Sequence, residues 1–342
     1  MAISIGINGF GRIGRVALRI AISRPETFKL CGINARNADL DYMVYMIRYD
    51  STFGRFQGEL GTYEHGLIIN GQKIPVFTEG DAASIPWGSC GAEYIIDATG
   101  AFCTAKKASA HLQGGAKKVI ISAPAKDEET PTFIMGINHT GYSKDMSVVS
   151  NASCTTNCLA PMAKVLNDYR EVRTGFMTTI HAYTGDQMLL DGPHRKGDLR
   201  RARAGAINIV PNSTGAAKAI GLVIPELAGK LIGSAQRVPV PSGSITILDA
   251  TLKDMTDSVS VEGINAAMKA AANASFGYTE EELVSSDIIG MSYGSLFDAT
   301  QTLAQQCGTH IYEVRIVAWY DNEMSYTCQL IRTLKHLKKF IK

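Results

Sequence analysis

Cys154 and His181 are the residues of this 342-residue sequence whose types and positions best suit covalent catalysis. Cys154 lies in the polar run Ser150-Asn-Ala-Ser-Cys-Thr-Thr-Asn-Cys158, directly before an apolar helical stretch over 159–169. Ser, Thr and Asn are favoured at helix starts because they accept hydrogen bonds from free main-chain N–H groups. A thiol there lies at the positive end of the helix dipole, so we expect its pKa to be lowered. The position predicts a thiolate nucleophile.

A thiolate nucleophile needs a base, and His181 is suitably placed. It ends the strand-like run 176–181 and opens a polar loop over 182–187. A strand end is a rigid place to hold a base. From the residues alone, a surface histidine and a core cysteine remain open as an alternative. Cys158, one helical turn further on, is expected to face the core.

The remaining cysteines predict neither disulfides nor a metal site. Seven cysteines are present, an odd number at scattered spacing, which argues against a disulfide framework. No C-x-x-C pair occurs, so a zinc ribbon is not expected. We therefore expect no metal.

A glycine-rich loop near the start of the chain predicts a dinucleotide site. Gly9-Phe-Gly-Arg-Ile-Gly14 has the pattern G-x-G-x-x-G between a strand-like run, 3–7, and a helical run, 12–23. Gly9 permits a tight turn, Gly11 lets the main chain approach a pyrophosphate, and Gly14 lets helix pack on strand. Free N–H groups at the helix start then face the phosphates. A glycine turn without a ligand is the alternative.

The end of the second predicted strand bears on the choice of dinucleotide. An NAD site usually has Asp or Glu there, bonded to the ribose 2′-hydroxyl. Here the strand ends in Ile33-Asn-Ala-Arg36, without a carboxylate, and Asp39 and Asp41 come too late. Arg36 suits a 2′-phosphate better than a bare hydroxyl, which indicates NADP or NAD as the cofactor. The alternative is that Arg36 is a solvated loop charge.

The elements that hold these residues fall into two parts. Strands and helices alternate up to about residue 150, which predicts a Rossmann-type, doubly wound parallel sheet. Later strands are longer and predict an α+β domain with a largely antiparallel sheet. We assign 1–152 to the dinucleotide-binding domain, joined by a C-terminal helix over 320–342, and 153–319 to the catalytic domain. From composition alone, that helix either packs on the first domain or is a solvated face.

Composition narrows the partners. The formal net charge is +2, too close to neutral for a dedicated nucleic-acid binder. No long apolar segment occurs that could span a membrane, and the first apolar run is too short for a signal peptide. We expect a cytoplasmic protein that binds no nucleic acid and no membrane.

Together, these residues resemble the glyceraldehyde-3-phosphate dehydrogenase family over essentially the whole chain. The matching motifs are Ile7-Asn-Gly-Phe-Gly-Arg-Ile-Gly14, Tyr49-Asp-Ser-Thr52, Ala98-Thr-Gly100, Ile121-Ser-Ala-Pro124, Ser153-Cys-Thr-Thr-Asn-Cys158, His181-Ala-Tyr-Thr184, Asp198-Leu-Arg-Arg-Ala-Arg203, Asn212-Ser-Thr-Gly-Ala-Ala-Lys218, Arg237-Val-Pro239 and Trp319-Tyr-Asp-Asn-Glu323. So many ordered motifs at family spacing are far more specific than any one of them.

The resemblance implies an NAD(P)-dependent, phosphorylating oxidation of glyceraldehyde 3-phosphate to 1,3-bisphosphoglycerate, in glycolysis or gluconeogenesis. Cys154 would form a thioester, with His181 as its base. The substrate's phosphate would bind Thr184 and Arg237, and inorganic phosphate would bind Ser153, Thr155, Thr214 and Gly215. Asn322 would orient the nicotinamide amide, and the other cofactor contacts would come from Asn8, Gly9, Gly11, Arg12, Ile13, Gly14, Asn34, Ala35, Arg36, Thr99, Gly100 and Ser122.

Two departures from the family pattern concern the adenosine side of the cofactor. The family's Asp after the second strand is Ala35 here, and the Arg that often precedes Asp81 is Gly80. Both put strict NAD use in question. The resemblance also implies a homotetramer, in which the basic loop 191–203 lies beside a neighbouring subunit's cofactor cleft.

Two alternative functions are weighed against this one. An erythrose-4-phosphate dehydrogenase is a close alternative, but its relatives tend to lose the turn that is intact here as Ser213-Thr-Gly215. A Cys–His hydrolase is a different class, and the nucleotide loop argues against it.

Overall fold

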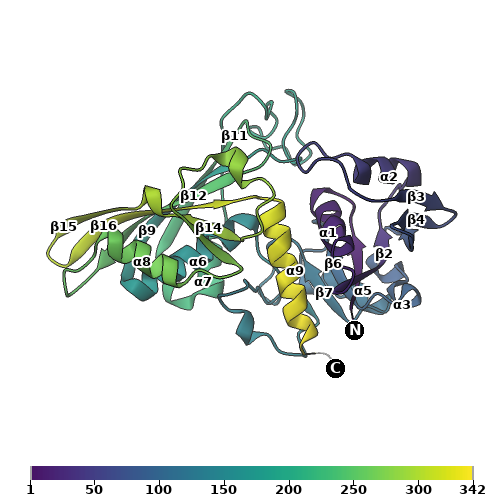
Figure 1. Cartoon of the computed structure of the whole chain (residues 1–342), viewed down its shortest axis with the longest axis horizontal. Coiled ribbons are helices and arrows are strands. Elements are labelled where there is room, and N and C mark those ends of the chain that lie inside the picture. Colours follow the sequence, from purple (N-terminus) through teal and green to yellow (C-terminus); the bar gives the residue numbers. More distant parts are fainter. Residues whose placement is uncertain (1, 341–342) are drawn as a thin grey trace. The chain divides into compact units, whose positions relative to one another are not determined.

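The computed structural model describes residues 2–340, which divide into two compact units. The first unit contains 2–135, 139–152 and 327–340, and the second contains 136–138 and 153–326. Each unit is built around its own sheet (Figure 1).

The sheet of the first unit has the strand order β3-β4-β5-β2-β1-β6-β7-β8. From β5 to β8 all neighbours are parallel, whereas β3, β4 and β5 form antiparallel pairs. The strands are β1 (Ile3–Asn8), β2 (Phe28–Asn34), β3 (Leu60–Tyr63), β4 (Gly66–Ile69), β5 (Gln72–Phe77), β6 (Tyr94–Asp97), β7 (Lys118–Ile121) and β8 (Val148–Ser150). Their apolar side chains, such as Ile5, Ile33 and Ile95, are fully buried. Both faces of a parallel sheet are covered, so nearly every position along its strands is apolar.

The first unit also contains helices. They are α1 (Arg12–Ile22), α2 (Leu40–Arg48), α3 (Trp87–Cys90), α4 (Ala105–Ala108), α5 (Ala110–Gln113) and most of α9 (Met324–Lys338), with short 3-10 turns at Ala82–Ser84 and His139–Gly141. β1 ends at Asn8, β2 at Asn34 and β6 at Asp97, and these strands are neighbours in the sheet. Their carboxyl ends therefore lie along one edge, where open parallel sheets bind ligands.

The second unit contains a sheet with the order β10-β11-β9-β12-β16-β14-β13, and β15 also pairs with β16. Most neighbours are antiparallel, and β11–β9 and β13–β14 are parallel. The strands are β9 (Glu171–Ala182), β10 (Val210–Asn212), β11 (Leu231–Val238), β12 (Ser244–Lys253), β13 (Phe276–Thr279), β14 (Ser295–Asp298), β15 (Leu303–Gly308) and β16 (Ile311–Tyr320).

Three helices pack on this second sheet (Figure 1). They are α6 (Cys154–Tyr169), α7 (Ala216–Val223) and α8 (Val261–Ala270), with 3-10 turns at Pro225–Leu227, Ser285–Ile288 and Ala299–Gln301. α6 is buried along most of its length and contacts β9, β12, β14 and β16. It therefore fixes the position of its first residue, Cys154, over the sheet.

The predicted fold class, a doubly wound parallel sheet plus an α+β part, is confirmed. Some elements differ from expectation. Between β6 and β7, two short helices, α4 and α5, stand in place of one continuous helix, and they are separated at Ser109. The C-terminal helix begins at Met324 rather than at residue 320, because Asp321 accepts hydrogen bonds from the Glu323 and Met324 N–H groups. No helix among the described residues is both long and apolar enough to cross a membrane.

Candidate active site

Ser153 caps helix α6 and places Cys154 at its first position. The Ser153 Oγ accepts a hydrogen bond from the Thr156 N–H over 3.0 Å. The preceding residue, Ala152, has φ = +56°, a left-handed conformation that L-residues rarely adopt. The chain thus turns sharply into the helix, and the thiol lies where the first helical N–H groups are free of main-chain partners.

His181 lies near the end of β9 and meets the thiol. The Cys154 Sγ is 3.5 Å from the His181 Nε2. The His181 Nδ1 is 2.6 Å from the Ala182 carbonyl oxygen, which can only accept, so Nδ1 carries the proton and donates it there. The Nε2 atom is consequently an acceptor that faces the thiol, as a general base requires.

Burial favours the uncharged form of both members of this pair. Burial raises the pKa of the Cys154 thiol, while hydrogen bonds from Thr155 and the charge of Arg237 act in the opposite direction. Burial also lowers the pKa of His181 to about 4. The expectation of a lowered thiol pKa is therefore wrong for the resting pair, because desolvation outweighs the favourable helix position.

A cation lies beside the base. Arg237 is the register partner of His181 in the parallel pair β11–β9. Its Nη1 donates to the Thr184 hydroxyl and, over 3.1 Å, to the Gln187 Oε1. Burial lowers the pKa of this guanidinium, but Arg remains charged in proteins. Arg237 and Thr184, which were predicted together as phosphate ligands, therefore do lie together.

Gln187 was not predicted, although it belongs to this group. Its Oε1 also accepts from the Thr184 N–H, and its Nε2 is buried without a hydrogen-bond partner among the described residues. A buried donor without a partner is costly unless a ligand completes it. The polar loop after His181 was the sequence signal that could have found this side chain.

The residues predicted to bind inorganic phosphate do not form one hydrogen-bonded group. The Thr155 hydroxyl is 2.9 Å from the Tyr320 Oη, so this side chain is already engaged. The Ser153 hydroxyl caps α6. Thr214 and Gly215 begin α7, where the Thr214 Oγ1 accepts from the Ala216 N–H. Among the described residues, neither of these two hydrogen-bonds to Cys154, His181 or Arg237.

Asn322 follows β16 and is held by two buried serines. The Ser242 and Ser244 hydroxyls both lie 3.3 Å from the Asn322 Oδ1. The Ser242 Oγ is also 2.8 Å from the Asp321 Oδ1, and the Ser244 Oγ accepts from the Ala182 N–H over 3.0 Å. Asn322 is therefore fixed to the same stretch of β9 that holds His181.

The glycine loop of the first unit has the shape that a dinucleotide needs. Gly9 has φ = +102°, and a Cβ there would lie 2.9 Å from the Ala98 carbonyl carbon. A Cβ at Gly14 would lie 2.0 Å from the Gly9 oxygen, so only glycine fits. A Cβ at Gly11 would meet open space, and Gly11 caps α1 without a side-chain bond. The start of α1 thus presents bare main chain to a ligand.

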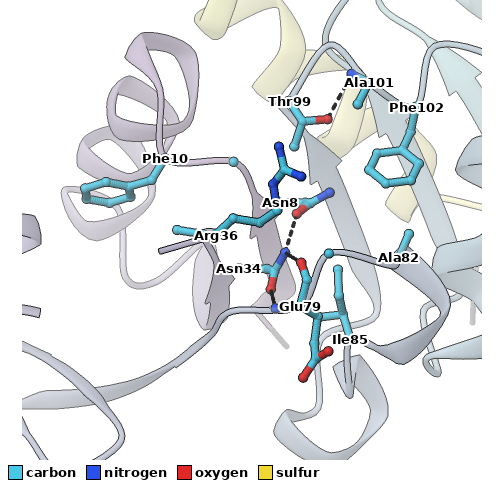
Figure 2. A pocket seen from close by; sticks show the side chains of 13 residues that line it. Asn8, Phe10, Asn34, Arg36, Glu79, Ala82, Ile85, Thr99, Ala101 and Phe102 are labelled. Carbon is cyan, nitrogen blue, oxygen red and sulfur yellow. Dashed lines mark hydrogen bonds between the residues drawn. The ribbon is translucent and has the colours of Figure 1, made fainter. Parts of the chain in front are cut away.

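Beside this loop lies a pocket of about 390 Å³ in the first unit (Figure 2). Of the predicted cofactor residues, its lining includes Asn8, Gly9, Asn34, Ala35, Arg36 and Thr99. Gly80, which the sequence placed on the adenosine side of the cofactor, also lines it, and the lining that was not assigned comprises Phe10, Glu79, Ala82, Ile85, Ala101 and Phe102. Arg36 and Glu79 are the charged side chains of this lining, and they point in opposite directions (Figure 2).

A buried hydrogen-bond network supports the wall of this pocket. The Asn34 Nδ2 donates to the Asn8 Oδ1 over 2.8 Å, and the Asn8 Nδ2 donates to the Asp97 Oδ2 over 2.7 Å (Figure 2 shows the first of these). Asp97 also accepts from the Thr99 N–H and hydroxyl, and its Oδ2 lies 3.1 Å from the His111 Nε2. The Trp87 Nε1–H donates to the His111 Nδ1, so Nε2 carries the proton.

The remaining predicted cofactor residues lie outside this lining. The Arg12 guanidinium bonds both oxygens of Asp50, at 2.6 and 3.1 Å, so its charge is paired within the unit. Ile13 lies in the first turn of α1. Gly100 has φ = +69°, and the Ser122 N–H donates to the Asp97 carbonyl.

Comparison with known proteins matches both units. Residues 3–105 match the family model described as glyceraldehyde 3-phosphate dehydrogenase, NAD binding domain, and residues 153–322 match its C-terminal domain. The chain is 55% identical over 339 residues to the glyceraldehyde-3-phosphate dehydrogenase of Clostridium pasteurianum, covering 99% of each chain. It is 56% identical over 344 residues to that of Streptococcus pyogenes serotype M1, covering 100% of each.

The chain belongs to the glyceraldehyde-3-phosphate dehydrogenase family.

Membership of this family implies that the pocket and the glycine loop bind a nicotinamide dinucleotide. The residues present fit one. Bare main chain at Gly11 suits a pyrophosphate, the pocket beside it is walled by ordered amides, and Arg36 adds a cation. Asn8, Asn34, Thr99 and Arg36 are the side chains that would hold the adenosine part.

Proposed function

We propose that this protein catalyses the phosphorylating oxidation of glyceraldehyde 3-phosphate, with NAD or NADP as the hydride acceptor. The observation that carries the proposal is the 3.5 Å contact between the Cys154 Sγ and an unprotonated His181 Nε2, with the Arg237 guanidinium on the neighbouring strand. A relative named glyceraldehyde-3-phosphate dehydrogenase, 55% identical over nearly the full length, supports the same function.

The residues of the chain account for each protein-side step. His181 Nε2 takes the thiol proton as the Cys154 Sγ adds to the aldehyde carbon. The protonated Nε2 gives this proton to the alkoxide that forms, and it takes the proton back as the carbon loses a hydride, which leaves a thioester on Cys154 and a protonated His181. A bound nicotinamide ring supplies the hydride acceptor. Inorganic phosphate attacks the thioester, and the thiolate leaves with the bonding electron pair and takes back a proton.

Substrate recognition is assigned to the group around Arg237. A charged, half-buried guanidinium binds phosphate strongly, and Thr184 and Gln187 orient it by accepting hydrogen bonds from its Nη1. The buried Gln187 Nε2 offers a further donor. This arrangement favours an aldehyde that carries its own phosphate over a neutral aldehyde.

The test is an assay of cofactor reduction with glyceraldehyde 3-phosphate, with and without inorganic phosphate. With phosphate, we expect steady turnover. Without it, we expect one burst of reduced cofactor per active site, because the thioester persists. Steady turnover without phosphate or arsenate would mean that water is the acceptor, and the absence of any cofactor reduction would contradict the proposal altogether.

We further propose that the enzyme accepts NADP well and prefers it to NAD. With Ala35, the chain lacks the carboxylate after β2 that would bond a ribose 2′-hydroxyl and repel a 2′-phosphate. Arg36 lines the same pocket, and a Cβ placed at Gly80 would lie 3.9 Å from the Arg36 Cδ, so nothing from Gly80 crowds the arginine.

A homotetramer is the assembly we propose. Five aliphatic side chains in the loop region 189–209 of the second unit have exposed fractions of 70–85%: Leu189, Leu190, Leu199, Ile207 and Ile209. An apolar group of this kind is typical of a surface that another chain covers. Sedimentation of wild-type protein and of Leu199→Asp tests this, and we expect dissociation of the variant; a wild type that sediments as a monomer would contradict the proposal.

A further inference from the structure

Ser244 is a buried residue of the second unit for which the proposed mechanism has no role. It is the first residue of β12, is 1% exposed, and lies between His181–Ala182 on β9 and Asn322 after β16. Its hydroxyl contacts both, so it bridges the strand that holds the base and the residue expected to meet the nicotinamide amide.

The hydrogen-bond directions at Ser244 follow from its partners. The Ala182 main-chain N–H can only donate, so it occupies a lone pair of the Ser244 Oγ over 3.0 Å. The single hydroxyl proton then points elsewhere, and its acceptor is the Asn322 Oδ1 at 3.3 Å. The β9 main chain thus sets the direction in which Ser244 donates.

Ser242 does not duplicate this role. Its Oγ lies 2.8 Å from the Asp321 Oδ1 and 3.3 Å from the Asn322 Oδ1, and it has one proton to give. A hydrogen bond to a carboxylate is shorter and stronger than one to a neutral amide, so the proton goes to Asp321. Ser244 is therefore the hydroxyl that defines which end of the Asn322 amide is the oxygen.

With its oxygen held, Asn322 has its amide nitrogen left over. Asn322 is 7% exposed, and its Nδ2 donates to no other residue that the structure describes. A carboxamide that could rotate by half a turn would present its oxygen in place of its nitrogen half of the time. Fixing Oδ1 on Ser244 keeps Nδ2 available as a donor.

We propose that Ser244 is a positioning residue that orients the Asn322 carboxamide, so that Nδ2 donates to the carboxamide oxygen of the nicotinamide. The proposal rests on the proposed function, in which Asn322 meets that group. Ser244 touches neither substrate nor cofactor and acts through Asn322, with its own rotamer fixed by the Ala182 N–H.

A double-mutant cycle tests the proposal with two readouts. Ser244→Ala, Asn322→Ala and the double variant are compared by calorimetric titration with the oxidised cofactor, and by kcat and KM for the cofactor. We expect Ser244→Ala to raise the dissociation constant and the KM about tenfold, or about 1.4 kcal/mol, and kcat to fall much less. On the Asn322→Ala background, we expect Ser244→Ala to add nothing.

Thr246→Val is the matched control, because Thr246 is also fully buried and lies two residues further along the same strand, on the same face. It should leave cofactor affinity unchanged. If Ser244→Ala fails to fold, Ser244→Cys, with a small side chain and a weaker donor, enters the same cycle.

The outcomes separate this inference from the function on which it rests. A wild type that does not reduce the cofactor, or an Asn322→Ala variant that binds it normally, contradicts the proposed function or the role of Asn322. If Asn322→Ala is impaired while Ser244→Ala binds cofactor normally, or is equally harmful on both backgrounds, then Ser244 does not act through Asn322.

Discussion

The polar side chains around the dinucleotide pocket bond mainly to one another, whereas the group around His181 and Arg237 keeps a buried donor, the Gln187 Nε2, without a partner among the described residues. In the first unit, Asn8 donates to Asp97 and accepts from Asn34, and Asn34 bonds the main chain of Glu79 on both sides of its amide. In the second unit, the Gln187 Nε2 is buried without a partner within the described part of the chain, and the thiol meets its base at 3.5 Å.

This difference between the two units is consistent with two roles, ligand binding in the first unit and catalysis in the second. A fully satisfied network is rigid and holds a binding wall in one shape before the ligand arrives. Groups that must exchange protons or bind a transferring phosphate need atoms that are free in the resting state. We therefore expect substitutions of Cys154 and His181 to change the chemistry, and substitutions in the pocket of the first unit to change affinity and cofactor choice.

The largest expected effect is the loss of the nucleophile. Cys154→Ser should lower kcat by on the order of 10⁴-fold or more, because a serine hydroxyl has almost no anion near neutral pH. Cofactor affinity, measured by calorimetry, should change little.

Cys158→Ser is the control for this substitution. Cys158 is fully buried with its Sγ 3.7 Å from the Ser295 Oγ, and burial raises its pKa to about 12. Cys158→Ser should lower the free energy of unfolding and change kcat little. An essential Cys158 together with a dispensable Cys154 would show that the nucleophile is misassigned.

Removal of the base should have the second-largest effect. His181→Asn should lower kcat by ~10²–10⁴-fold, the usual contribution of a general base. The variant should also alkylate with iodoacetamide more slowly at neutral pH, since nothing then accepts the Cys154 proton. Unchanged alkylation in His181→Asn would contradict the role of Nε2.

The sequence predicted the contact of Cys154 with His181 but not the charge state of the pair. A capped helix start and a strand end are local patterns, and both are readable from neighbouring residues. The raised pKa of Cys154 depends on how many atoms from β9, β12 and β16 surround α6, which no local pattern encodes. For the same reason, the 2.9 Å contact between the Thr155 hydroxyl and the Tyr320 Oη was not predicted.

The glycine loop illustrates the opposite case. The roles assigned to Gly9, Gly11 and Gly14 concern main-chain geometry within six residues, and the structure has those geometries. Gln187 and Ser244 were missed because their significance comes from partners 50 and 78 residues away, Arg237 and Asn322. The assignment of domains and of individual site residues stays a prediction until the experiments above are done.

Loss of the phosphate-binding cation should have an intermediate effect. Arg237→Leu should raise the KM for glyceraldehyde 3-phosphate by roughly 10–150-fold, the equivalent of a charge-assisted hydrogen bond of ~1.5–3 kcal/mol. Arg173→Leu, at an exposed position on the same strand as His181, is the control. Equal effects of the two substitutions would mean that Arg237 acts only through general charge.

Acid should destabilise the second unit through His181. Its pKa is lowered to about 4 from an ordinary 6.5, so between these values the unfolded chain binds more protons than the folded one. The free energy of unfolding therefore rises with pH across this window. It should be about 2 kcal/mol lower at pH 4.5 than at pH 7.

Urea denaturation of the wild type and of His181→Asn at these two pH values measures the difference. The nearby Cys154 thiol and Tyr320 phenol, whose pKa values are raised, stay uncharged throughout this range, and Arg237 stays charged. An equal loss of stability in both proteins would show that His181 is not held neutral by burial.

The smallest expected effect concerns the choice between NADP and NAD. It tests whether substitutions in the first unit change cofactor affinity without changing kcat. Ala35→Asp should shift the ratio of kcat/KM for NADP and NAD toward NAD by about tenfold or more, because a carboxylate bonds the ribose hydroxyls and repels a 2′-phosphate. Ala35→Ser adds a hydroxyl without charge and should shift the ratio much less. Arg36→Ala should weaken NADP alone.

These three variants separate charge, bulk and the arginine. If Arg36 bonds the 2′-phosphate, Arg36→Ala and Ala35→Asp both lower NADP affinity, and kcat stays close to wild type in each because neither residue touches Cys154 or His181. If Arg36 faces solvent, only Ala35→Asp acts, and the wild type tolerates both cofactors. A wild type that prefers NAD by more than about tenfold, roughly 1.4 kcal/mol, would leave the missing carboxylate at Ala35 without a function. A large fall in kcat in any of the three would show that the two units do not divide the work between affinity and chemistry.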